Sequence, residues 1–146
     1  MMTTDAIPRP ALLLGRAGVI PFALLTAASV LGIHPWSLDP RMALCAYGAC
    51  ILSLMGGVQW GVMLPREGGP VPFFRYAISV LPALLAFLCL LIPNTSGLIG
   101  LVVGFLALLA YDLSTVRQGL APRWYASLRV QLTLAVVVLL GVAVIA

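Results

Sequence analysis

Hydrophobic residues occupy five long stretches of this chain, and most charged residues lie at their ends or between them. The stretches cover residues 11–33, 42–64, 74–92, 98–118 and 122–146. Each is close to the ~20 helical residues that cross a bilayer, where backbone groups must bond within the helix. The pattern predicts an all-α fold in which residues 1–146 form a single transmembrane domain, a five-helix bundle.

Two of the connections contain residues that favour tight reversals. Residues 93–97, with the sequence PNTSG, interrupt a run that is otherwise uncharged from residue 76 to 111, and turn formers of this kind predict a helical hairpin. Gly119 suits the end of a helix, and Pro122 suits the first turn of the next one. The fourth and fifth helices are therefore expected to be antiparallel neighbours.

Arginine supplies all eight basic residues, and its distribution predicts the orientation of the bundle. Arg41 alone flanks one side. The other side has Arg9, Arg16, Arg66, Arg75, Arg117, Arg123 and Arg129. Because basic residues concentrate on the cytoplasmic side of membrane proteins, we expect a cytoplasmic N-terminus and a periplasmic C-terminus.

Composition excludes a soluble domain and makes membrane lipids the expected partners. Hydrophobic residues make up 62% of the chain and charged residues 8%, far from the balance of soluble proteins. The formal charge of +4 comes from arginines at helix ends, which form no cluster of the kind that binds nucleic acid. Arginines at helix ends are instead placed to contact lipid headgroups of the cytoplasmic leaflet.

Small residues recur every fourth position in the second and fourth stretches. This spacing places them on one helix face, where small side chains let another backbone approach. The stripes consist of Ala49, Ser53, Gly57 and Gly61 in the second stretch, and of Gly100 and Gly104 in the fourth. We interpret them as helix-packing surfaces. The alternative is a groove for a lipid tail or a partner helix.

Asp112 is an acidic residue within an apolar stretch, and such a carboxylate is costly unless it is paired. Arg16 and Arg129 are predicted at the same depth, and Gln59 and Trp60 belong to the same layer. One hypothesis is a structural ion pair that joins Asp112 to Arg16 or Arg129. The other is a polar pocket that opens toward the cytoplasmic leaflet.

No catalytic, cofactor-binding or metal-binding site is predicted. His34 is the single histidine, and the three cysteines are unclustered in apolar stretches, so the residues for a zinc or iron–sulfur site are lacking. Asp112 and His34 are expected at opposite faces of the membrane, which excludes a Ser-His-Asp set. An enzyme that acts on a lipid headgroup would need Asp112 as acid or base, a role that a carboxylate beside arginines fills poorly.

Several short motifs suggest a family. They are GRAGVIPF at residues 15–22, GGVQWG at 56–61, SVLP at 79–82, YD at 111–112, PRWY at 122–125 and LR at 128–129. In this order the chain resembles an uncharacterised family of small multi-pass membrane proteins of proteobacteria, to which mitochondrial transmembrane protein 69 is similar. The resemblance implies a bacterial inner membrane and no established activity. Members often have histidine at the position of Gln59, which argues against metal binding or proton transfer here.

Two functional hypotheses follow. The first is a non-enzymatic accessory or assembly partner of a larger membrane complex, since the chain has little mass outside the membrane and has stripes suited to helix docking. The alternative is a module that binds or transports a lipid, a quinone or an amphipathic anion. In that case Arg16 and Arg129 would hold the headgroup, Trp60 would stack on it, and Asp112 would orient an arginine.

Overall fold

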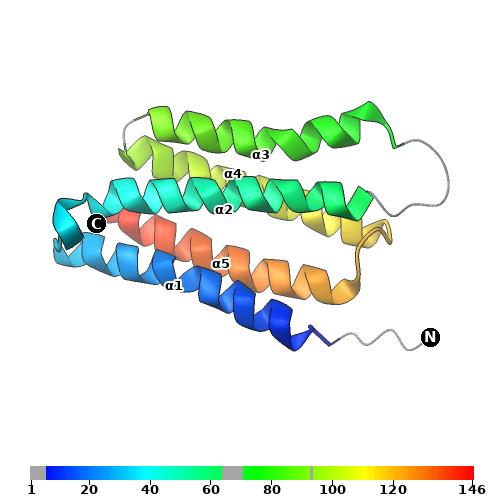
Figure 1. The fold of residues 1–146 in the computed structure, drawn as a ribbon, viewed down its shortest axis with the longest axis horizontal. Helices are drawn as coiled ribbons and strands as arrows, with labels where there is room; N and C mark the ends of the chain where they lie inside the picture. The colour runs from blue at the N-terminus through cyan, green and yellow to red at the C-terminus, as the bar shows by residue number, and fades with distance from the viewer. Residues whose placement is uncertain (1–5, 64–70, 93) are drawn as a thin grey trace.

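The computed structural model describes residues 6–63, 71–92 and 94–146, and it confirms the all-α fold (Figure 1). Within that part of the chain, five helices are each long and apolar enough to cross a membrane. They are α1 (Arg9–Leu31), α2 (Pro40–Met63), α3 (Phe73–Leu91), α4 (Asn94–Arg117) and α5 (Arg123–Ile145), and a short turn, η1 (Pro35–Ser37), precedes α2. Their ends lie within four residues of the predicted spans.

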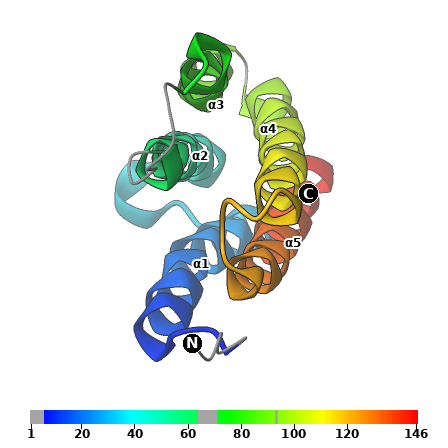
Figure 2. The same ribbon diagram turned by 90° about the vertical axis from the view of Figure 1, so that its right-hand side faces the viewer.

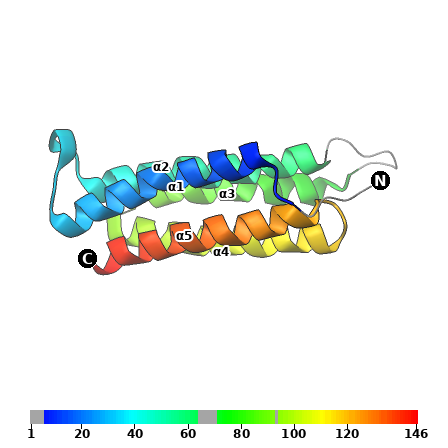
Figure 3. The same cartoon turned by 90° about the horizontal axis from the view of Figure 1, so that it is seen from below.

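The five helices form two layers, and consecutive helices run antiparallel (Figures 1 and 3). One layer contains α1, α2 and α3, and the other contains α4 and α5 (Figures 2 and 3). Both α2 and α4 lie between other helices, whereas α3 lies at one edge of the bundle (Figure 2). In the same view α5 lies between α4 and α1 and contributes buried residues along its length, so the interior is built around α2, α4 and α5.

Large apolar side chains fill the interior and also cover the outside. The fully buried set includes Phe22, Leu44, Leu52, Leu101 and Leu140. The exposed set includes Leu24, Leu84, Phe87, Val103 and Val138. Outer faces of this composition are matched to hydrocarbon, where packing and polar contacts, rather than exclusion of water, hold helices together.

Small residues let α4 approach α3 and α2 closely, although the hairpin differs from the expected one. A Cβ at Gly97 would lie 2.5 Å from the carbonyl oxygen of Cys89, and one at Gly100 would lie 2.6 Å from the Cys89 Sγ. The turn was expected to extend through residue 97, but α4 already begins at Asn94. Gly97 therefore lies inside α4, at its contact with α3, and not in the turn. Pro93 lies outside the described residues.

The stripe predicted on α2 only partly faces the bundle. Ala49 is buried and Ser53 half-buried, whereas Gly57 and Gly61 are exposed and a Cβ on either would meet no atom within 4 Å. In this second half of α2, the glycine that packs closely against α3 is Gly56, where a Cβ would lie 3.0 Å from Pro82. Because a helix has 3.6 residues per turn, a spacing of four drifts around the surface, so the outer members of the stripe turn toward lipid.

The α4–α5 connection ends α4 with a glycine in the left-handed conformation. Gly119 has φ +71°, and the amide of Leu120 donates to the carbonyl of Thr115 at 3.0 Å, a hydrogen bond that closes many helix ends. Pro122 directly precedes α5. The side chain of Arg75 donates to Gln118 at 2.9 Å and links the start of α3 to this connection. Arg66 lies outside the described residues.

Candidate functional site

A buried polar layer joins α2, α4 and α5 near the end of the bundle where α5 begins. Asp112 on α4 is 0% exposed, Gln59 on α2 is 1% exposed, and Arg129 on α5 is 4% exposed. Arg129 Nε donates to Asp112 Oδ2 at 2.5 Å, and Gln59 Nε2 donates to Asp112 Oδ1. Both carboxylate oxygens are thus held, one by a charged donor and one by a neutral donor.

Of the five residues that the sequence placed in this layer, the structure brings three together and places two elsewhere. Arg16 is exposed on α1, so Arg129 is the arginine that pairs with Asp112. Trp60 is also exposed, with its ring centroid 5.2 Å from that of Tyr76 on α3. Gln59 faces inward, and Trp60, the next residue, consequently points to a different side of α2.

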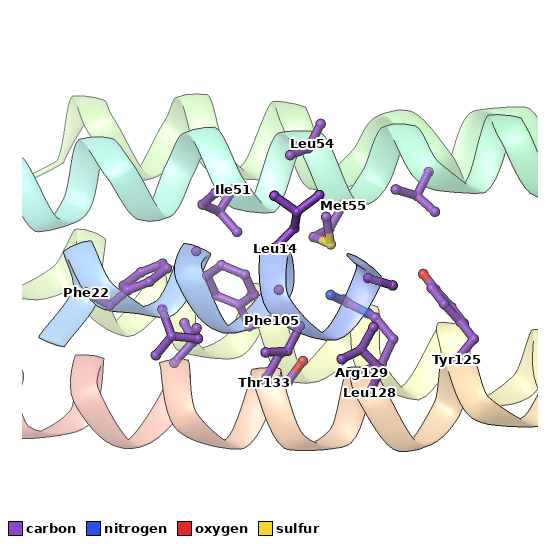
Figure 4. Close-up of a pocket in the computed structure, with 17 residues that line it drawn as sticks. Leu14, Phe22, Ile51, Leu54, Met55, Phe105, Tyr125, Leu128, Arg129 and Thr133 are labelled. Carbon is purple, nitrogen blue, oxygen red and sulfur yellow. The ribbon is translucent and has the colours of Figure 1, made fainter. Parts of the chain in front are cut away.

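An apolar chamber of about 320 Å³ lies beside this layer (Figure 4). Its walls are Ala11, Leu14, Gly15, Gly18, Val19 and Phe22 of α1, Ile51, Leu54, Met55 and Val58 of α2, Phe105 of α4, and Tyr125, Leu128, Arg129, Leu132, Thr133 and Val136 of α5. Among these described wall residues, Arg129 is the one that is charged. The chamber falls within the volume range of small-molecule pockets, which are mostly apolar with a few placed polar groups.

The side of the chamber between α1 and α2 faces the surroundings of the bundle. Two wall residues there, Leu14 and Leu54, are 75% and 60% exposed. The helix α1 diverges from α2 toward its own beginning (Figure 1), and Pro21 lies inside it. Proline removes a backbone hydrogen bond and permits such a bend. The chamber therefore has its mouth toward the lipid phase.

Three polar side chains of α5 line this wall, and each of them has a buried atom without a partner. Within the described part of the chain, the buried side-chain atoms without a hydrogen bond are Tyr125 Oη, Arg129 Nη2 and Thr133 Oγ1. All three residues line the chamber. They follow each other at a spacing of four along one face of α5 (Figure 4). Buried polar atoms in proteins normally find partners, so three on one wall indicate a place for a polar group.

Arg129 connects the layer to the chamber. Its Nε donates a hydrogen bond to Asp112, and its Nη2 has no hydrogen-bond partner among the described residues. Arg129 is also one of the residues that line the chamber. The arrangement supplies hydrogen-bond donors beside an apolar space. It offers no nucleophile beside a base, and within the described residues no group of three His, Cys, Asp or Glu side chains is placed to hold a metal ion. Binding is the chemistry that these groups support.

Tyr125 and Thr133 were not identified as site residues from the sequence. A signal was present, because both lie four residues from Arg129 and must share its helix face. No such sequence signal marks the wall residues of α1, because Gly15, Gly18 and Phe22 resemble ordinary packing residues. Only the position of α1 relative to α5 makes them part of a cavity.

Comparisons with known proteins agree with the fold and show a family. The family model described as "Protein of unknown function (DUF3429)" matches residues 7–145. Transmembrane protein 69 of Xenopus tropicalis is 38% identical over 135 residues, which cover 89% of this chain and 51% of that protein. Transmembrane protein 69 of Mus musculus is 32% identical over 132 residues, covering 87% and 52%. The chain thus spans about half the length of these relatives. No solved structure matches it.

Proposed function

Because the chain belongs to the DUF3429 family of multi-pass membrane proteins, whose description names no activity, we propose from its site that it binds an amphipathic molecule in the chamber between α1, α2 and α5. The observation behind the proposal is that Tyr125, Arg129 and Thr133 all line one apolar wall and that each has a buried side-chain atom without a partner. A lipid, a quinone or an amphipathic anion would place its polar group on these atoms and its apolar body among the leucines.

Each of the three unpartnered atoms lowers the stability of the empty protein for the same reason. A buried donor or acceptor without a partner costs about 1–3 kcal/mol, so three of them on one helix would be a substantial penalty in a small bundle. An occupant that bonds to them removes the penalty, and its apolar body also fills the space. Water would satisfy the polar atoms, but it would leave the predominantly apolar remainder of the wall unmatched.

The Gly18→Leu variant should close the chamber without disturbing the bundle. Gly18 lines the chamber, and a Cβ there would meet no atom within 4 Å, so a leucine has room to extend into the space. We expect native mass spectrometry in mild detergent to find a bound small molecule on the wild type and none on this variant.

The matched control is Gly57→Leu. Gly57 also lies inside a helix, and a Cβ added to it would have no atom within 4 Å, but it is outside the chamber wall. This variant should keep the bound molecule. Equal loss from both variants, or a wild type that binds nothing even when membrane lipids are added back, would contradict the proposal.

We also propose that the protein lies in a bacterial inner membrane with its arginine-rich end in the cytoplasm, which puts the chamber in the cytoplasmic leaflet. Labelling of introduced cysteines with an impermeant maleimide tests this orientation. His34 and Gln118 are both exposed and lie at opposite ends of the bundle. In intact spheroplasts we expect His34→Cys to be labelled, and Gln118→Cys to be labelled only after the membrane is opened. The reverse pattern would invert the orientation.

The role as accessory or assembly partner of a larger membrane complex stays a prediction. Gly57 and Gly61 are exposed on α2, and a Cβ at either would meet no atom within 4 Å, so a lipid or another helix fits there equally well. Binding in the chamber and association with a partner are compatible. The chamber has the more specific chemistry, because buried polar atoms without partners lie on its wall residues.

A further inference from the structure

The three unpartnered atoms define what kind of polar group the occupant has. Arg129 Nη2 can only donate hydrogen bonds, whereas the hydroxyl groups of Tyr125 and Thr133 can donate and accept. A group that satisfies Arg129 must therefore accept. Tyr125 and Thr133 lie one helical turn from Arg129 in opposite directions along the same face of α5, so a polar group bound to Arg129 has one hydroxyl group on either side of it.

The charge balance of the site restricts the acceptor further. Arg129 is the one charged residue among the described residues of the chamber wall, and its positive charge is already matched by Asp112. An anion in the chamber would add a negative charge that no other cation of this wall balances. A cation would face the guanidinium group directly. Uncompensated charge is strongly disfavoured where water is scarce, so the site favours a neutral occupant.

Resting on the proposed binding function, we infer that the occupant presents a neutral carbonyl oxygen to Arg129 Nη2, and that one of the two flanking hydroxyl groups, Tyr125 Oη or Thr133 Oγ1, donates the second hydrogen bond to that oxygen. A carbonyl oxygen accepts two hydrogen bonds and has no hydrogen of its own to oppose the guanidinium group. Two sources in a membrane have this chemistry, the ester of an acyl lipid and the ring carbonyl of a quinone. Both also supply the apolar body that the walls from α1 and α2 require.

The test compares probes of matched length at equal concentration in detergent. They are a thirteen-carbon methyl ketone, the alkane of the same length, the twelve-carbon fatty acid as its anion, and the corresponding alkylammonium. Binding is read from the shift in thermal unfolding and from native mass spectrometry. We expect the ketone to bind at least about tenfold more tightly than the other three, as one to two added hydrogen bonds would give. A methyl ester and a benzoquinone with a decyl tail then distinguish the two sources. The probe that binds more tightly identifies the occupant as an acyl lipid or as a quinone.

The variants Tyr125→Phe and Thr133→Val remove the two hydroxyl groups and keep the shape of the wall. Without ligand, both should unfold at the same temperature as the wild type or higher, because each loses a buried polar atom that had no partner among the described residues. The variant that has lost the second donor should bind the ketone several-fold less tightly, and both variants should bind the alkane as the wild type does. A merely structural role for these hydroxyl groups would lower stability and leave the preference for the ketone intact.

The possible outcomes test the carbonyl group of the occupant and the binding function of the chamber separately. If the ketone and the alkane bind equally, or if the fatty-acid anion binds best, the carbonyl inference is wrong although the chamber still binds ligand. If no probe binds to the wild type, the proposed function itself fails. Selective binding of the ketone that is weakened in Tyr125→Phe or in Thr133→Val supports both.

Discussion

Replacing Asp112 by alanine is expected to lower the free energy of unfolding by about 3–5 kcal/mol, the usual cost of leaving one partner of a buried ion pair without its counter-charge. Asp112 is 0% exposed and bonds to both Arg129 and Gln59, so its removal strands a cation and an amide in the interior. Denaturation in mixed micelles, followed by circular dichroism, measures the change.

Two companion variants make the Asp112 experiment specific. The double variant Asp112→Leu/Arg129→Met removes both charges and should recover most of the lost stability, because apolar residues of similar volume often replace a buried pair without loss. Arg16→Met should change stability by less than about 0.5 kcal/mol, since Arg16 is exposed. If Arg16→Met is as damaging as Asp112→Ala, the pairing described for Asp112 is wrong.

Gly97→Ala is expected to lower the free energy of unfolding by about 1–3 kcal/mol, because a single added methyl group overpacks the contact between α3 and α4. The new Cβ would lie 2.5 Å from the carbonyl oxygen of Cys89 and 3.0 Å from Cys45 Sγ. A backbone carbonyl cannot move aside as the end of a flexible side chain can. The two helices must therefore separate.

Gly57→Ala provides the matched comparison for Gly97→Ala. Both glycines lie inside helices, so both substitutions gain the same intrinsic helix preference of about 1 kcal/mol. A Cβ at Gly57 meets no atom within 4 Å, and that variant should be as stable as the wild type or slightly more stable. If Gly97→Ala matches Gly57→Ala in a denaturation curve, the close approach at Cys89 is not a constraint on the fold.

The five helices could be predicted from the sequence because lipid imposes a simple rule on length and polarity. Each span must satisfy its own backbone, and the apolar stretches therefore coincide with α1 to α5 within a few residues. The hairpin at residues 93–97 was placed too far along the chain, because Gly97 has the same signature in a turn and at a close helix contact. Propensity alone does not separate these two uses of glycine.

The candidate site could be predicted only in part. The cost of burying a carboxylate pointed to Asp112 and required a cation near it, but two arginines satisfied that requirement at the same depth. The choice of Arg129 over Arg16 depends on how α1 and α5 are rotated, which helical periodicity leaves open. Trp60 likewise lies at the expected depth but on the side of α2 that faces Tyr76. The chamber arises from the divergence of α1 from α2, a tertiary feature with no local signature.

The most direct test of the binding proposal is an experimental structure of the protein purified with its native lipids. We predict elongated density in the chamber, with one end within hydrogen-bond distance of Arg129 Nη2 and the other between Leu14 and Leu54. A chamber that contains only water, or one closed by α1 packing against α2 and α5, would contradict the account.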